Sequence, residues 1–110
     1  MDREAAVEAA LERIIDFFRP EQVYLFGSQA RGDVRPNSDI DFLVVVPDSA
    51  GRELWRLGKL YESFIGLGVG IDVVPFRRAA FEEQKSWIMS LPAIVLQEGK
   101  LIYDAAWQAA

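Results

Sequence analysis

An apolar run from Phe42 to Pro47 sets the strongest limit on the fold. Both the odd and the even positions of this run are apolar, so neither face of a strand formed by it suits water. Strands of this kind are typical of central positions in a sheet that is covered on both sides. We therefore predict a central strand over residues 39–46, ended by Pro47 and Asp48.

Helices and short strands are expected to alternate along the rest of the chain. The predicted helices cover residues 4–19, 52–65, 79–89 and, after a bend, 92–98, with a short helix over 28–32 capped by Ser28. The other predicted strands cover residues 22–26, 70–74 and 101–103; Pro75 ends the second of these, and residues 104–110 are expected to fray. This order predicts one α/β domain over residues 1–110, with its core at about 4–103 and a small sheet flanked by about four helices.

The composition excludes several classes of chemistry. The 110 residues include no Cys and no His, which rules out disulfides, zinc sites built from thiolate or imidazole, and Ser/His triads. Asp and Glu remain as ligands and bases, and such oxygen ligands suit Mg²⁺. The net charge of −5 argues against general nucleic-acid binding. With no signal peptide pattern and no apolar run long enough to cross a bilayer, we expect a cytoplasmic protein without a membrane partner.

Gly27 and Ser28 directly follow the predicted strand that ends at Phe26. A glycine at this point allows a phosphate to approach the backbone. The following amides and the Ser28 hydroxyl could then donate hydrogen bonds to phosphate oxygens. A Gly-Ser pair after a strand is also common in ordinary turns. On its own, this pair does not distinguish a phosphate site from a turn.

Three aspartates lie on predicted strands. Asp39 and Asp41 open the strand 39–46, and because alternate strand residues point to the same face, both carboxylates project together. Such a pair can hold two cations about 3.5–4 Å apart; an acidic strand edge in water is the alternative. Asp72 lies in an apolar stretch, where a carboxylate is costly unless it is paired or binds a metal. A position at a sheet edge or a salt bridge to an arginine would also explain Asp72.

Together, Gly27-Ser28, ten intervening residues, Asp39-x-Asp41 and the later Asp72 resemble the signature of the polymerase-β nucleotidyltransferase superfamily. The resemblance is closest to its minimal nucleotidyltransferase (MNT) domain, extends over about residues 7–103, and includes the segment 97–103 at the C-terminal edge. It implies a polymerase-β-like nucleotidyltransferase fold with a small mixed sheet.

The same resemblance assigns roles to single residues. It implies that Gly27 and Ser28 hold the triphosphate of ATP, and it makes Arg31 a candidate phosphate contact, although a solvated loop cation is the alternative. Two Mg²⁺ ions, or Mn²⁺ in their place, would be bound by Asp39 and Asp41. Asp72 would bind the ion beside the attacking hydroxyl and help to deprotonate that hydroxyl.

The resemblance also implies a partner and a reaction. Family members of this length often accompany a HEPN-domain ribonuclease toxin, so the chain is expected to be an antitoxin that transfers AMP from ATP to a toxin tyrosine. Two alternatives stay open. One is a binding module that neutralises its partner by occlusion, and the other is a small-molecule nucleotidyltransferase that completes its site as a homo-oligomer. The acidic residues favour an active enzyme, because occlusion needs no acidic cluster.

Overall fold

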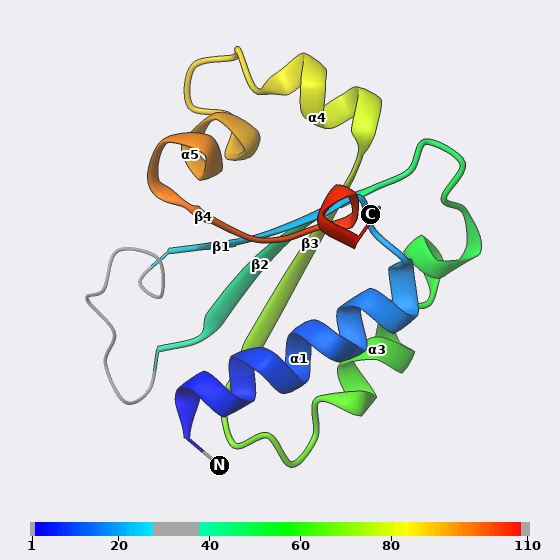
Figure 1. Ribbon diagram of the computed structural model, residues 1–110, viewed down its shortest axis with the longest axis vertical. Helices are drawn as coiled ribbons and strands as arrows, with labels where there is room; N and C mark the ends of the chain where they lie inside the picture. Colours follow the sequence, from blue (N-terminus) through cyan, green and yellow to red (C-terminus); the bar gives the residue numbers. More distant parts are fainter. Residues whose placement is uncertain (1, 28–37, 109–110) are drawn as a thin grey trace.

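The computed structural model describes residues 2–27 and 38–108 of the chain, and Figure 1 shows their arrangement. The strands are β1 (Gln22–Phe26), β2 (Ile40–Val46), β3 (Ile71–Arg77) and β4 (Lys100–Asp104). The helices are α1 (Arg3–Phe18), α3 (Leu57–Ser63), α4 (Arg78–Gln84) and α5 (Leu91–Glu98), with short 3₁₀ turns η1 (Arg52–Trp55) and η2 (Ala105–Gln108). The strand order is β3-β2-β1-β4, with β3 parallel to β2 and the other pairs antiparallel. The predicted mixed sheet flanked by helices is confirmed.

Strand β2 occupies the predicted central position, between β1 and β3. Residues 42–46 are all 0% exposed. The even-numbered side chains of β2 belong to a core cluster shared with α1 and α3, whereas Leu43 and Val45 pack with Phe81 of α4 and Val95 of α5. The two faces of β2 are therefore covered by different helix pairs, which is why the run has no polar position.

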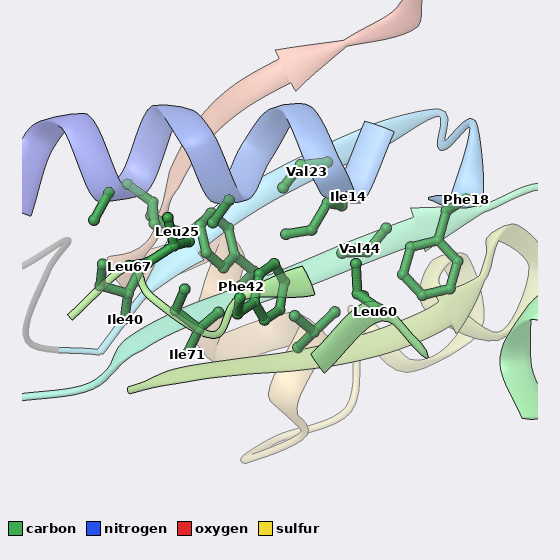
Figure 2. Packing of buried hydrophobic residues seen from close by; sticks show 14 of the residues in the cluster. Ile14, Phe18, Val23, Leu25, Ile40, Phe42, Val44, Leu60, Leu67 and Ile71 are labelled. Carbon is green, nitrogen blue, oxygen red and sulfur yellow. The ribbon is translucent and has the colours of Figure 1, made fainter. Parts of the chain in front are cut away.

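Helix α1 covers one face of the sheet with a single stripe of side chains. Its buried residues recur every four positions: Ala6, Ala10, Ile14 and Phe18. Figure 2 shows Ile14 and Phe18 close to Val44 of β2 and Leu60 of α3. The side chain of Asp2 caps the start of the helix by accepting a hydrogen bond from the Ala5 amide, at 2.7 Å. The first turn of α1 is thus fixed at both its cap and its buried face.

The prediction that Pro75 ends the third strand is wrong, since β3 continues to Arg77. Strand β3 is at the edge of the sheet, and the Val73 amide donates outward to the Tyr61 hydroxyl, at 2.9 Å. Pro75, two residues later, has its nitrogen on the same outer side. It therefore removes no hydrogen bond from the sheet, which is the usual condition for proline in an edge strand.

Two predicted helices are shorter than expected. The helix over 52–65 is divided at Arg56, which leaves the α-helical region (φ −116°, ψ 30°), and its second part, α3, ends at Ser63. The helix over 79–89 ends at Gln84, and Met89 adopts a positive φ of 68° before Ser90 caps α5.

The end of the described chain also departs from the prediction. Residues 105–108 form a 3₁₀ turn instead of a frayed tail, tied to the sheet by the Ala105 amide, which donates to the Glu21 carbonyl at 2.9 Å. The predicted short helix over 28–32 lies outside the described residues. Within the described part of the chain, no helix has the length and apolar character needed to cross a membrane.

Candidate active site

Asp41 and Asp72 lie side by side on the two parallel strands. They are register partners, at the second residue of β2 and of β3. Adjacent strands are about 4.8 Å apart, so carboxylates at paired positions can share one ligand. The neighbours of both residues, such as Ile40 and Ile71, are buried in the cluster under α1. By alternation, both carboxylates project from the opposite face, the one that carries α4 and α5.

Asp39 completes the acidic group from the residue just before β2. Asp41 is half-buried, whereas Asp39 and Asp72 are exposed. The pKa of Asp41 is raised, first by burial, then by the negative charges of Asp72 and Asp39 and by a hydrogen bond with Asp72. Asp41 is therefore within electrostatic reach of both other aspartates selected from the sequence.

Of the explanations that the sequence left open for Asp72, the structure shows the position at a sheet edge: Asp72 is exposed at the start of the edge strand β3. The Asp72 carboxylate is in contact with water, so its charge does not need a metal ion or an arginine to stabilise it. What distinguishes Asp72 is its position opposite Asp41, which no pattern within a single strand reveals.

Gly27 directly follows β1 and lies beside Asp41. Its φ of +70° is in the left-handed region, which glycine tolerates best. A side-chain carbon at this position would lie 2.5 Å from Oδ2 of Asp41. Glycine is therefore required here both for the turn and for the space that the carboxylate occupies. Ser28 and Arg31, the other two predicted nucleotide contacts, lie outside the described residues.

The donor chemistry of the acidic group fits a magnesium site. Among residues 2–27 and 38–108, no three acidic side chains are gathered closely enough to enclose a cation by themselves. Magnesium does not need such a cage, because it is usually bound by one or two carboxylates together with substrate phosphates and water. Asp41 and Asp72 supply paired carboxylates. Burial and then the negative charges of Asp72 and Asp39 raise the pKa of Asp41, and a bound cation would relieve that repulsion.

A groove elsewhere on the surface is not part of this group. It has a volume of about 490 Å³ and lies between α1 and the β1–β4 pair, lined by Val7, Leu11, Leu25 and Ile102 among others. Leu25 belongs to the core cluster under α1. The groove is therefore on the α1 side of the sheet, and the carboxylates project from the other side.

Two residues that the sequence analysis did not select contact Asp39. The guanidinium of Arg3 donates to the Asp39 carbonyl at 3.2 Å, and Gly70 lies against the Asp39 side chain. Arg3 is 36 residues away along the chain. No local motif includes either residue, so only the folded arrangement could have identified them.

The raised pKa of Asp41 predicts a pH-dependent gain of stability in the metal-free Asp41→Asn variant. An acid whose pKa is raised on folding destabilises the folded state once it ionises. The metal-free variant should therefore melt at a higher temperature than the wild type at pH 7. The difference should vanish as the pH falls below the ordinary aspartate value of about 3.9. Thermal melts in EDTA between pH 3 and 8 would test this, and a difference independent of pH would contradict it.

The sequence profile of the nucleotidyltransferase domain family matches residues 7–102. That range includes all four strands except the last two residues of β4, together with Gly27, Asp39, Asp41 and Asp72. The chain therefore belongs to the nucleotidyltransferase domain family, and it is a nucleotidyltransferase.

Individual relatives agree with this assignment. The chain is 30% identical, over 94% of its length and 100% of the relative's, to MJ0604 of Methanocaldococcus jannaschii, a candidate protein adenylyltransferase. A crystal structure of a toxin–antitoxin with AMP-PNP is 26% identical, with a TM-score of 0.55 over 88% of this chain and 75% of that one. A mutant of the toxin–antitoxin MntA–HpeT, 21% identical over 98% of this chain and 77% of the other, shares the fold with a TM-score of 0.56.

Proposed function

We propose that the chain transfers AMP from ATP to a hydroxyl group of a partner protein, with Mg²⁺ or Mn²⁺ as cofactor. The observation that carries the proposal is the pairing of Asp41 with Asp72 across the parallel strands, beside Gly27 and within the electrostatic reach of Asp39. The relative of 30% identity is a candidate protein adenylyltransferase, which favours a protein acceptor. The related toxin–antitoxin crystallised with AMP-PNP favours an adenine nucleotide as donor.

In this proposal each carboxylate has a separate task. Asp39 and Asp41 would bind both cations, and Asp72 would bind the one nearer the acceptor. The cations would neutralise the charge of the phosphates and lower the pKa of the acceptor hydroxyl. The acceptor oxygen forms a bond to the α-phosphorus, the bond from the α-phosphorus to the bridging oxygen breaks, and pyrophosphate leaves. The acceptor proton passes to Asp72. Gly27, Ser28 and Arg31 would hold the triphosphate.

The proposed acceptor is a tyrosine of a HEPN-type toxin, with the chain as its antitoxin. Two related structures are toxin–antitoxin complexes, which supports a toxin as partner. The net charge of −5 would favour encounter with a basic protein surface.

The direct test uses the chain, Mg²⁺, ATP and the co-encoded toxin. Intact-mass spectrometry of the toxin is expected to show increments of one AMP, and peptide mapping should place them on tyrosine. The reaction should stop in EDTA and with Asp41→Asn. A toxin whose mass stays unchanged while the wild-type chain still neutralises it would contradict the proposed transfer.

Binding of nucleotide and metal should also stabilise the chain. A ligand at one hundred times its dissociation constant raises the free energy of unfolding by about 2.7 kcal/mol. We therefore expect ATP with Mg²⁺ to raise the melting temperature clearly, and ATP with EDTA to raise it much less. Differential scanning fluorimetry would show this, with Asp41→Asn as the control that loses the shift. Equal shifts with and without Mg²⁺ would argue against a metal-bridged nucleotide.

Neutralisation by occlusion is the second candidate function, and one surface feature favours it. Trp87, Ile88 and Met89, in the turn between α4 and α5, are 50%, 93% and 78% exposed. Such a run of large apolar side chains on a surface is typical of a contact with another protein. The turn follows α4, on the side of the sheet from which the carboxylates project. If occlusion is the mechanism, Asp41→Asn will still neutralise the toxin, whereas Ile88→Asp will not.

A further inference from the structure

We infer that Arg3 and Gly70 are positioning residues for Asp39: Arg3 fixes the backbone of Asp39, and Gly70 leaves the space in which the Asp39 carboxylate lies. This inference rests on the proposed function, because it assigns to both residues an effect on the proposed cation site. Neither residue is expected to touch the nucleotide or the acceptor. Their effect would pass through Asp39.

Arg3 connects the start of α1 to the residues that lead into β2. Its guanidinium donates to the carbonyls of Ser38 and Asp39, the latter at 3.2 Å. Both bonds come from Nη2 of Arg3, which carries two hydrogens and can therefore donate to two carbonyls at once. The first turn of α1 is itself capped by Asp2 and anchored by the buried Ala6. The backbone of Asp39 is therefore held from an element that belongs to the core of the domain.

Gly70, just before the neighbouring strand β3, contacts Asp39. The Ile40 amide donates to the Gly70 carbonyl at 2.8 Å, which brings the residue before β3 against the residue before β2. A side-chain carbon on Gly70 would lie 2.9 Å from Cγ of Asp39 and closer still to its Oδ1. Contacts under 3.0 Å are essentially never made by real Cβ atoms. The Asp39 carboxylate thus lies in the volume that any side chain at position 70 would fill.

The requirement for glycine at position 70 is steric. Among the described glycines, positive φ angles occur at Gly27, Gly66 and Gly68, and Gly70 is not one of them. An alanine could therefore adopt the backbone conformation of Gly70 without strain. Its methyl group would meet the exposed side chain of Asp39, whose carboxylate atoms are the nearest to that position. Gly70→Ala should accordingly move one carboxylate while leaving the fold intact.

The test measures Mn²⁺ binding by electron paramagnetic resonance, in the presence of a non-hydrolysable ATP analogue. Changes to residues that orient metal ligands typically reduce metal affinity 10–100-fold. We expect Gly70→Ala to weaken Mn²⁺ binding about tenfold with little change in melting temperature. The matched control is Gly58→Ala in α3, where an added Cβ meets no atom within 4 Å. That control should bind Mn²⁺ as the wild type does.

A double-mutant cycle shows whether Gly70 acts through Asp39. Asp39→Asn should weaken Mn²⁺ binding by itself, and adding Gly70→Ala to it should cause no further loss.

The role of Arg3 is tested separately. Arg3→Gln should weaken Mn²⁺ binding several-fold, and Arg3→Lys should restore only part of the affinity. Arg13→Gln, in the same helix, is the control. The inference would be overturned if Gly70→Ala and Arg3→Gln bound Mn²⁺ with wild-type affinity, or if Gly70→Ala caused its full loss of affinity in the Asp39→Asn background as well. Either result would leave the proposed function standing. A wild-type chain that binds no Mn²⁺ with nucleotide would overturn the proposed function as well.

Discussion

Asp41→Asn is expected to reduce AMP transfer by about 10³-fold or more, which corresponds to a loss of several kcal/mol of transition-state stabilisation. Asp41 is the most enclosed of the three aspartates, half-buried between Asp72 of the neighbouring strand and the turn at Gly27. Asparagine has almost the same size, so the packing around position 41 should persist. It carries no negative charge, however, and offers one carbonyl oxygen in place of two carboxylate oxygens.

Single-turnover assays with labelled ATP and the acceptor protein would measure this loss. Asp16→Asn, an exposed change in the last turn of α1, is the matched control and should keep wild-type turnover. Circular dichroism should show that Asp41→Asn is folded, and its higher melting temperature in EDTA would separate lost chemistry from lost structure. Turnover within a few-fold of the wild type would remove Asp41 from the proposed site.

Much of the fold follows from patterns within single elements. The apolar run of β2 predicts its central position, since a strand without polar positions must be covered on both faces. The four-residue spacing of the α1 stripe predicts that helix in the same way. Both patterns can be recognised within one element, because each depends only on the spacing of apolar residues along that strand or helix.

What the sequence could not predict depends on which elements become neighbours. Pro75 continues a strand only because β3 is at the edge of the sheet and its nitrogen faces outward. Asp72 is exposed on the same edge strand, a position that the sequence left open as one alternative. Arg3 and Gly70 reach Asp39 from 36 residues before it and 31 residues after it, and neither contact has a local signature. The parallel pairing of β2 with β3 brings Gly70 to Asp39, and the packing of α1 on the sheet brings Arg3 there; no motif spans either arrangement.

Asp72→Asn is expected to separate turnover from nucleotide binding. In the proposed site, Asp72 acts on the acceptor side, and Gly27, Ser28, Asp39 and Asp41 hold the triphosphate with its cation. Loss of a proton acceptor in the transition state typically costs 10²–10⁴-fold in rate. Turnover should fall by about that factor, whereas the affinity for a non-hydrolysable ATP analogue with Mg²⁺ should stay within about threefold of the wild type.

Position 72 suits this test because the side chain is exposed at a strand edge, so the substitution to asparagine should leave the core unchanged. Isothermal titration of the analogue and single-turnover transfer would be measured on the same protein samples, with Asp41→Asn as the comparison that loses both binding and turnover. The acceptor-side role also predicts that a more acidic acceptor, such as a fluorinated tyrosine, will recover part of the rate in Asp72→Asn and none in Asp41→Asn. If Asp72→Asn lost the nucleotide as completely as Asp41→Asn does, the two carboxylates would serve a single shared cation and the division between them would be wrong.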